Sequence, residues 1–548
     1  MCLKPEPIGP VPERTVQVAK AAFPKGNTAL RVRDDLGGLF EDSAFAELFP
    51  SRGQPGLAPW RLALVTVLQF AEGLSDRQAA EAVRGRIDWK YALGLELEDA
   101  GFDFSVLSEF RSRLVAGAAE SLLLDAMLGR LQTHGLLRPR GHQRTDSTHV
   151  LASVRTLNRL ESLGETLRAA LNAAATAAPD WVTSIAAPEW YERYAKRFEQ
   201  YRLPRGEAAR RDFAVVIGTD GHQLLDAVWA DNAPAGLSRL PAMETLRRAW
   251  VHHFYRGNDG QIALRDRTEL PSVTCRFDGP YDTDARFGNK RSLTWSGYKA
   301  HLTETCDTDQ PHVIVHVATT PANVADVSMT AAIQDAAGIK GLAPAVHLVD
   351  GGYIDAGLVL AGRNAGIELI GPLRPNVSWQ ARTNGAYDVS AFAVDWDARV
   401  VTCPQGHRNA DWNPSRDPWG TEVVHVSFPG PTCRACAERA RCTRSKTAPR
   451  EVTLRAGGRH EIIQDQRQRE QTEAWQALYG KRAGIEGCLS QAIRLTGLRR
   501  ARYVGLAKTH LQHVATAAAI NVVRLDAWFR NVPFAGTRIS RFAALRPA

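Results

Sequence analysis

Residues 345–353 read Ala-Val-His-Leu-Val-Asp-Gly-Gly-Tyr, and this stretch decides the fold. The apolar run that ends at Val349 predicts a buried strand, and the two glycines after Asp350 predict that the strand stops there. An acid at this point lies at the edge of a sheet, where sites form in open α/β sheets. Asp350 is therefore a candidate functional residue. The alternative is a plain strand-to-helix turn in which Asp350 is a helix N-cap.

Further strand and helix patterns surround this stretch. We expect strands at 143–152, 293–304, 313–319, 345–350 and 368–370, and helices at 323–336 and 355–365. In chain order they read strand, strand, strand, helix, strand, helix, strand. This order matches the ribonuclease-H-like fold, a mixed sheet with helices packed on it. The sequence therefore predicts an α+β protein with a core of this kind.

The chain has 548 residues, and a single core rarely grows beyond about 300 residues, so several substructures are expected. Before the first strand, an apolar helical run at 60–71 ends at Gly73, and Ser75 can cap the next helix together with Gln78. This helical pair is compatible with a helix-turn-helix that contacts DNA, or with two helices that only pack together in a bundle. We expect a flexible arm at 1–25, a helical DNA-binding domain at 26–140, a first core strand at 141–155, a mainly helical insertion at 156–292, the core at 293–371, a cysteine-containing insertion at 372–460, core helices at 461–525 and a basic tail at 526–548.

Charge is concentrated at the C-terminal end. The chain has a formal net charge of +9, and residues 481–548 hold twelve Lys or Arg against two acids, which gives this segment +10. A basic segment on a neutral body suggests a polyanionic partner, nucleic acid first, although a solvated tail is the alternative. The N-terminus has no apolar run, and no stretch approaches the roughly 20 apolar residues of a membrane span. We expect a cytoplasmic protein, associated with the bacterial nucleoid and not with a membrane.

Two further acids stand in chemically suggestive contexts. Asp146 lies in the strand-like run Arg-Thr-Asp-Ser-Thr at 144–148, where an acid can also be a plain surface or turn residue. Tyr479, Arg482 and Glu486 are spaced i, i+3 and i+7, so a helix would place them on one face. That face could bind metal through the acid and phosphate through the arginine and tyrosine. The alternative is an ordinary amphipathic helix with an internal Arg–Glu pair.

The pattern Tyr-x2-Arg-x3-Glu, preceded by a strand Asp and by Asp-Gly-Gly-Tyr, resembles the acid-triad (DDE) transposases of bacterial insertion sequences, families 4, 5 and 1182. The resemblance covers most of residues 30–525 and includes Trp295–Asp307. It implies that Asp146, Asp350 and Glu486 bind Mg²⁺ or Mn²⁺ and that Tyr479 and Arg482 handle phosphate. The family has a Lys six residues after the Glu. Here the first basic residue after Glu486 is Arg494, with seven residues between them.

The resemblance implies a transposase that cuts the ends of its element and joins 3′-hydroxyls to target DNA. Its partners would be double-stranded DNA, as terminal inverted repeats and target, and further copies of itself in a homo-oligomer. Lys481, Arg499, Arg500 and Arg502 are the candidates for contacts with the DNA backbone. Two alternatives stay open: a structure-specific nuclease of the same fold, and a DNA-binding relic with a dead site.

The insertion at 372–460 holds a second candidate metal site. Cys403 begins Cys-Pro-Gln-Gly-His, Cys433 and Cys436 form a Cys-x2-Cys pair, and Cys442 follows. This pattern is compatible with a structural four-thiolate Zn²⁺ site, in which His407 could replace one cysteine. The alternative is a set of reduced, buried cysteines.

Overall fold

The computed structural model describes the chain except for residues 1, 6, 156, 273–278, 534–544 and 546–548. Arg538, Arg541 and Arg546 of the expected basic tail lie outside the described residues. The expected tail also begins too early, because helix α21 (Leu506–Phe529) continues through Asp526, whose side chain is buried and pairs with Arg31. In the described part of the chain, no helix is both long and apolar enough to cross a membrane.

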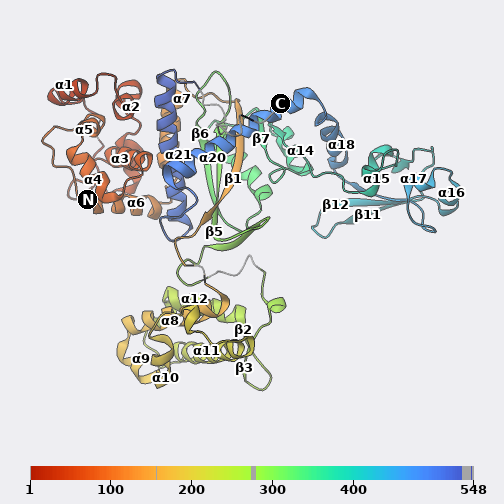
Figure 1. The fold of residues 1–548 in the computed structure, drawn as a ribbon, viewed down its shortest axis with the longest axis horizontal. Coiled ribbons are helices and arrows are strands. Elements are labelled where there is room, and N and C mark those ends of the chain that lie inside the picture. Colours follow the sequence, from red (N-terminus) through yellow and green to blue (C-terminus); the bar gives the residue numbers. More distant parts are fainter. Residues whose placement is uncertain (1, 6, 156, 273–278, 534–544, 546–548) are drawn as a thin grey trace.

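A mixed sheet forms the centre of the molecule (Figure 1). Its order is β4-β5-β1-β7-β8, and β6 pairs with β5 as well. β5 is antiparallel to β1, β4 and β6, whereas β1, β7 and β8 run parallel. The strands are β1 His142–Leu151, β4 Arg286–Lys290, β5 Leu293–Thr305, β6 Ile314–Pro321, β7 Val346–Val349 and β8 Glu368–Ile370. The structure thus has the strands expected for the core, and β4 in addition.

Helices from distant parts of the chain cover this sheet. α13 (Thr330–Ile339) and α14 (Ala356–Asn364) connect the parallel strands and cluster with Val349 and Leu369. α20 (Gly484–Thr496) and α21 pack on apolar residues of β1, β5 and β6. The region where core helices were expected, 461–525, begins with a broken helical segment. It divides into α18 (Arg459–Arg469), α19 (Glu473–Gly480), a 3₁₀ turn at Lys481–Ala483 and α20. One break has a clear cause, because Thr472 accepts a hydrogen bond from the Trp475 backbone N–H and starts α19 afresh.

The N-terminal helices share one hydrophobic core with the sheet and α21. The capping box predicted at Ser75 and Gln78 is confirmed, and Gly73 ends α3 with φ +69°. The flexible arm expected at 1–25 is wrong: α1 packs against α5, and Thr15 donates a 2.9 Å hydrogen bond to the Leu95 carbonyl. The helices are α1 Glu13–Ala22, α2 Thr28–Leu36, α3 Pro59–Glu72, α4 Asp76–Gly85, α5 Ile87–Leu93, α6 Ser105–Ala116 and α7 Leu122–Thr133.

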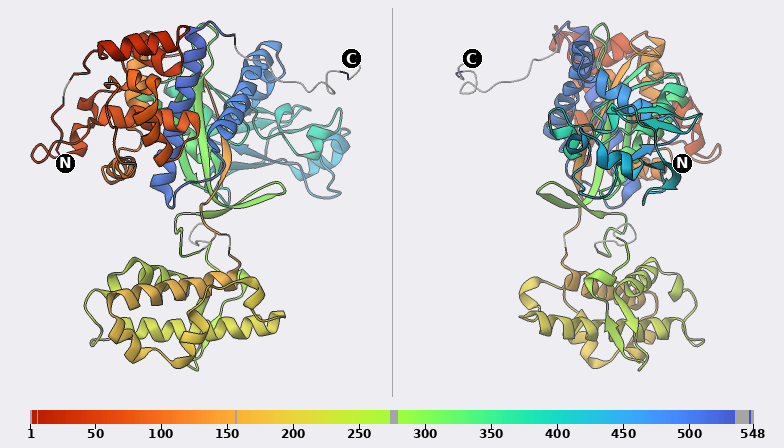
Figure 2. Two further views of the ribbon diagram at one scale, coloured as in Figure 1. Left: turned by 60° about the vertical axis from the view of Figure 1, so that its left-hand side comes forward. Right: turned by 90° about the vertical axis from the view of Figure 1, so that its right-hand side faces the viewer.

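The insertion after β1 forms a helical body with its own core, joined to the sheet region by extended segments (Figure 2). It contains α8 Arg159–Ala177, α9 Pro179–Ile185, α10 Pro188–Tyr194, α11 Glu207–Val228, α12 Pro241–His253, β2 Phe254–Arg256 and β3 Ile262–Leu264. The expected boundary at residue 292 is wrong, because β4 already belongs to the central sheet as a hairpin with β5. Its pairing with β5, across the short turn at 291–292, makes a strand of residues 286–290 despite their polar composition.

The insertion after β8 is a small β-rich unit at the far end of the molecule from the N-terminal helices (Figure 1). β11, β12 and β13 form one antiparallel sheet, and β9 and β10 form a second. A separate core of seven buried residues, among them Phe392 and Phe428, holds the unit together. Its elements are α15 Trp379–Arg382, β9 Ala393–Asp395, β10 Val400–Thr402, β11 Asp411–Arg416, β12 Glu422–Ser427, α16 Gly430–Ala435, α17 Arg439–Cys442 and β13 Glu451–Arg455.

Candidate active site

Two of the three candidate acids, Asp146 and Asp350, occupy equivalent positions beside each other on neighbouring parallel strands. The last register pair of β1 and β7 joins Thr145 to Val349, so Asp146 and Asp350 are the next residue on each strand. Residues in register on adjacent strands point to the same face of a sheet. Asp350 accepts a 2.8 Å hydrogen bond from the Gly352 backbone N–H, which orients its carboxylate in the turn after β7. Asp350, which was expected where a strand ends, thus lies beside Asp146 of the central strand.

Arg482 joins the third acid to the first. Its Nη1 donates to Asp146 over 3.1 Å, and its Nη2 lies 3.6 Å from Glu486 in the first turn of α20. Asp146 is only 6% exposed, whereas the Glu486 side chain is 64% exposed. Tyr479 belongs to α19 and stacks on Trp475 with 4.7 Å between ring centroids. The Tyr479, Arg482 and Glu486 side chains thus form one group, although a 3₁₀ turn interrupts the expected α-helix.

The electrostatics of Asp146 show that all three acids interact. Burial is the main reason that the pKa of Asp146 is raised to about 6. The negative charges of Asp350 and Glu486 raise this pKa as well, while the Ser147 backbone hydrogen bond and Arg482 oppose the shift. Burial would lower the pKa of Arg482, but Asp146 and its other neighbours outweigh burial and raise it. At neutral pH the site therefore contains a buried Asp146 carboxylate paired with the permanently charged Arg482.

This donor set suits a divalent cation by its chemistry, because Mg²⁺ and Mn²⁺ prefer carboxylate oxygens. A cation at Asp146 would also relieve its repulsion by the other two acids. Among the residues that the structure describes, however, no group of three or more His, Cys, Asp or Glu side chains is close enough to hold a metal ion. The Arg482 guanidinium lies between Asp146 and Glu486 instead. Metal binding would thus require this guanidinium to move aside and the acids to draw together.

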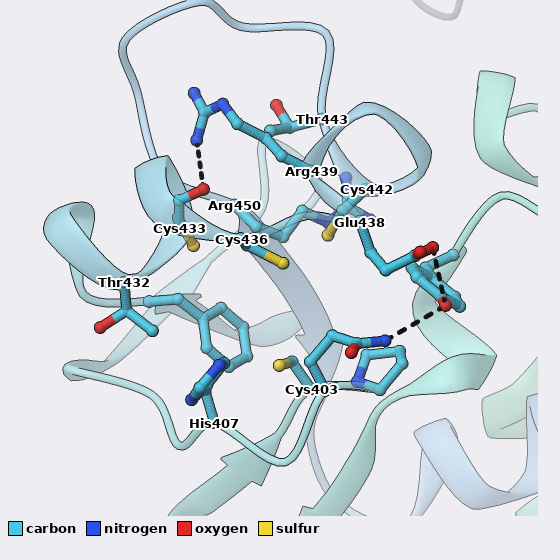
Figure 3. Close-up of a pocket in the computed structure, with 14 residues that line it drawn as sticks. Cys403, His407, Thr432, Cys433, Cys436, Glu438, Arg439, Cys442, Thr443 and Arg450 are labelled. Carbon is cyan, nitrogen blue, oxygen red and sulfur yellow. Dashed lines mark hydrogen bonds between the residues drawn. The ribbon is translucent and has the colours of Figure 1, made fainter.

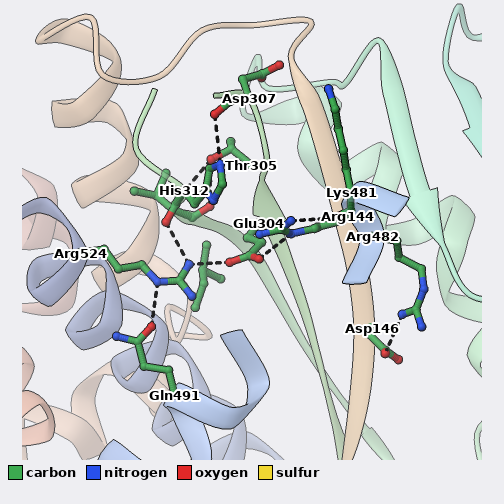
Figure 4. Close-up of polar contacts among 12 residues, drawn as sticks. Arg144, Asp146, Glu304, Thr305, Asp307, His312, Lys481, Arg482, Gln491 and Arg524 are labelled. Carbon is green, nitrogen blue, oxygen red and sulfur yellow. Dashed lines mark hydrogen bonds and ion pairs between the residues drawn. The ribbon is translucent and has the colours of Figure 1, made fainter. Parts of the chain in front are cut away.

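A buried ionic network ties the strand of Asp146 to the helix of Glu486 (Figure 4). Arg144, two residues before Asp146 on β1, donates to the Lys481 carbonyl over 2.6 Å and to Glu304 over 2.7 Å. Glu304 is fully buried and pairs with Arg524 of α21 as well. Burial favours its neutral form, but the two arginines outweigh burial and lower the pKa of Glu304. The network therefore fixes the 3₁₀ turn that carries Arg482 against the sheet.

Helix α20 begins at Gly484, which lies beside the Arg144 guanidinium of this network. A Cβ at Gly484 would lie 2.0 Å from Nη1 of Arg144, so only glycine fits beside the guanidinium as it stands. The same arginine is held by Glu304 and by the Lys481 carbonyl, which limits how far it can move. The close approach of β1 and α20 therefore depends on this glycine.

Sequence reasoning missed a second polar group beside the acids. Asp326 accepts from Lys299 over 2.9 Å and from Ser147 over 3.3 Å. A Cβ built at Gly352 would lie 3.0 Å from Asp350 Oδ1 and 3.7 Å from Asp326 Oδ2, which places both acids around the same glycine. Lys299 lies in the segment Trp295–Asp307 that carried part of the family resemblance. No pattern around Asp326 distinguishes it, because it follows β6 in an ordinary turn before α13.

The basic residues expected to contact DNA differ in their surroundings. Arg499 is exposed, but its Nε donates to Thr148, which is two residues after Asp146 on β1. Arg502 stacks over the Phe70 ring at 4.7 Å and donates to the Thr496 carbonyl, so it has partners within the protein. Arg502 is nevertheless exposed, as are the three other candidates, Lys481, Arg494 and Arg500.

Models of known protein families match two separate parts of this chain, one N-terminal and one C-terminal. A family model described as "Transposase domain (DUF772)" matches residues 17–113, which hold α1 to most of α6. A model described as "Transposase DDE domain" matches residues 402–526, which include Arg482 and Glu486. Two transposase models match this chain. The matches support a transposase function, and no curated protein matches the chain. Asp146 and Asp350 lie outside both transposase matches, so their assignment rests on the geometry of β1 and β7.

Proposed function

We propose that this chain is a DNA transposase of an insertion sequence, which cuts the ends of its element and joins the 3′-hydroxyls to target DNA. The observation that supports it most is that Arg482 contacts both Asp146 and Glu486, while Asp350 directly follows the strand next to that of Asp146. The two transposase matches support the general activity. The mixed sheet, with antiparallel β5 and parallel β7 on either side of β1, is consistent with a ribonuclease-H-like core.

In this proposal Asp146, Asp350 and Glu486 hold Mg²⁺ or Mn²⁺. Bound metal ions would activate the attacking water or 3′-hydroxyl and stabilise the leaving oxygen. The chain's own residues place the reactants and neutralise charge. Arg482 pairs with Asp146 and Glu486 in the metal-free protein, and its guanidinium would bind a phosphate oxygen of the DNA. Tyr479, stacked on Trp475, presents its hydroxyl beside Arg482 for the same phosphate.

DNA would approach along the exposed basic residues around α20. Arg499 is the strongest candidate for a backbone contact, because Thr148 holds it beside the strand of Asp146. Lys481, Arg494 and Arg500 are exposed on the segment that carries Glu486. Because each element has two ends, we propose that the active form is a homo-oligomer that holds both ends together.

The proposal is tested with DNA that carries the gene of this chain and its flanking sequence. Cleavage and strand transfer are measured with Mg²⁺ or Mn²⁺ for wild type and for Asp146→Asn, Asp350→Asn and Glu486→Gln. We expect each variant to bind DNA but to lose cleavage and joining. Glu244→Gln is the matched control, because Glu244 forms only an exposed pair with Arg247 on the helical insertion. Cleavage that survives in all three site variants contradicts the proposal.

Pre-cut ends distinguish the alternatives. A transposase joins such ends to a second DNA, whereas a structure-specific nuclease cuts but does not join. A relic with a dead site binds DNA and does neither. Joining that depends on Asp146, Asp350 and Glu486 supports the transposase alone.

A further inference from the structure

The β-rich insertion contains a cavity that gathers all four of its cysteines. Its volume is about 30 Å³, and its lining includes Cys403, Cys433, Cys436 and Cys442. Figure 3 shows the four sulfur atoms directed into the same space. All four are free thiols and partly buried. Such a cavity has room for a water-sized particle.

We propose that Cys403, Cys433, Cys436 and Cys442 bind one structural Zn²⁺ as a four-thiolate site. Zn²⁺ takes four thiolates in tetrahedral sites that are closed to other ligands. Binding would convert four thiols to thiolates and release four protons, with no redox change. The site belongs to the insertion and not to the Asp146 site, so it is independent of the proposed DNA chemistry.

The two halves of the site come from separate folded turns. Cys403 lies in a tight turn: its carbonyl accepts from the Gly406 N–H over 2.9 Å, and its N–H donates to the His407 carbonyl over 2.8 Å. Gly406 has φ +81°, which favours glycine. This backbone arrangement holds the Cys403 thiol at the tip of the turn, where it can act as one ligand.

The other three thiols come from the two short helices opposite. Cys433 lies in α16, Cys436 directly follows that helix, and Cys442 ends α17. Arg439 joins the pieces, because its Nη1 donates to the Cys433 carbonyl over 3.1 Å and its backbone N–H donates to the Cys436 carbonyl over 3.2 Å. Each half of the site is thus prepared by its own hydrogen bonds before a metal binds.

The surroundings favour four cysteines over three cysteines and His407. His407 lines the cavity but is exposed, whereas the four cysteines are partly buried. Its backbone carbonyl already closes the turn at Cys403. We therefore assign His407 a role in that turn and not as a ligand.

A half-buried cation in the cavity wall has the charge that would offset such a site. Zn²⁺ with four thiolates carries a charge of −2, which must be offset where the surroundings are apolar. Arg450 lines the cavity, and its Nε is shielded from solvent without a hydrogen-bond partner among the described residues. Its guanidinium also lies over the Phe392 ring of the insertion core at 5.6 Å. An unpaired donor of this kind suits a thiolate acceptor in the metal-bound form.

A metal would add to the stability of the insertion. Its own core has only seven buried residues, and a metal that joins the Cys403 turn to α16 and α17 would cross-link the unit. No three ligating side chains in the described structure are close enough to hold a metal as they stand, so the thiols must draw together on binding, including the three from α16 and α17. Metal binding would therefore couple directly to the stability of this insertion.

The test uses the full chain and Zn²⁺ itself. Purified protein is treated with a chelator, dialysed against Zn²⁺ and assayed for bound metal. We expect one zinc per chain in wild type, and a loss to about a tenth of that in Cys433→Ser/Cys436→Ser and in Cys403→Ser/Cys442→Ser. His407→Ala and Cys2→Ala are the controls, and both should keep the metal.

Co²⁺ in place of Zn²⁺ keeps the proposal testable if a variant misfolds. Wild-type protein with Co²⁺ should show the intense visible absorption and thiolate charge-transfer bands of a tetrahedral four-sulfur site. Absence of zinc from wild type, metal that survives in both double variants, or metal lost in His407→Ala would each overturn the four-cysteine assignment. Neither measurement uses DNA, so this result is independent of whether the chain cuts or joins DNA.

Discussion

Arg482 donates a 3.1 Å hydrogen bond to Asp146. The bond crosses from the turn before α20 to the central strand of the sheet, between residues 336 positions apart in the chain. It leaves the guanidinium between two acids of the proposed metal site, because Glu486 lies on its other side. The arginine therefore acts as an internal counter-ion where a metal is proposed to bind.

Arg482→Met should separate metal binding from chemistry. Loss of the guanidinium removes a cation that competes with metal, so the affinity for Mn²⁺ should stay the same or rise. Cleavage should fall about 100-fold or more, since a positioned donor to the reacting phosphate is lost. Mn²⁺ titration and cleavage assays check the two parts. Arg247→Met, on the exposed face of α12, is the control; weaker Mn²⁺ binding by Arg482→Met alone would contradict this role.

Asp146→Asn should stabilise the metal-free protein as the pH rises. An unfolded Asp titrates near 3.9, whereas burial and neighbouring acids raise the pKa of folded Asp146 to about 6. Because the folded pKa is raised, ionisation opposes folding, and stability is lost between pH 4 and 6 and stays lower above that range. The variant should gain up to about 3 kcal/mol over wild type across this window. Denaturant unfolding in chelator at several pH values measures the gap; a gap that does not change with pH would refute the prediction.

Gly484→Ala should separate α20 from β1. The added Cβ would overlap the Arg144 guanidinium, so we expect a loss of about 1–3 kcal/mol in stability and a fall in cleavage as Glu486 is displaced. Gly487→Ala is a matched control in the same helix, because a Cβ there meets nothing within 4 Å. Its helix propensity should instead stabilise the protein by about 1 kcal/mol. Thermal unfolding and cleavage rates compare the pair, and equal stability of the two variants would argue against the clash.

Arg499→Ala and Arg502→Ala should differ in their dependence on salt. Arg499 is exposed beside β1, so its loss should weaken DNA binding across sequences and reduce the salt slope by about 1. Arg502 is engaged with Phe70, so its loss should lower the melting temperature and leave the salt slope unchanged. DNA binding at several salt concentrations and thermal unfolding distinguish the two roles. Identical salt slopes for Arg499→Ala and wild type would remove Arg499 from the proposed interface.

The sequence alone predicted the elements whose signals lie close together in the chain. The strand that ends at Asp350, the strand around Asp146 and the capping box at Ser75 all depend on residues close together in the chain. Apolar runs, glycine stops and polar caps act over a few residues, so their periodicity predicts these elements directly. Helical spacing also predicted the grouping of Tyr479, Arg482 and Glu486, although the structure forms it across a 3₁₀ turn between α19 and α20 and not on one α-helix.

Tertiary structure decided the features that depend on distant partners. Helix α1 is held by its packing on α5, although a flexible arm was expected at residues 1–25. β4 is held by its pairing with β5, although the helical insertion was expected to continue to residue 292. The proximity of Asp326 to Asp350 also follows from chain packing that no local pattern carries. The sequence by itself determined which residues could form strands, caps and an acidic triad. Only the folded chain decided how closely they meet, because burial and pairing energies arise from contacts between segments far apart in sequence.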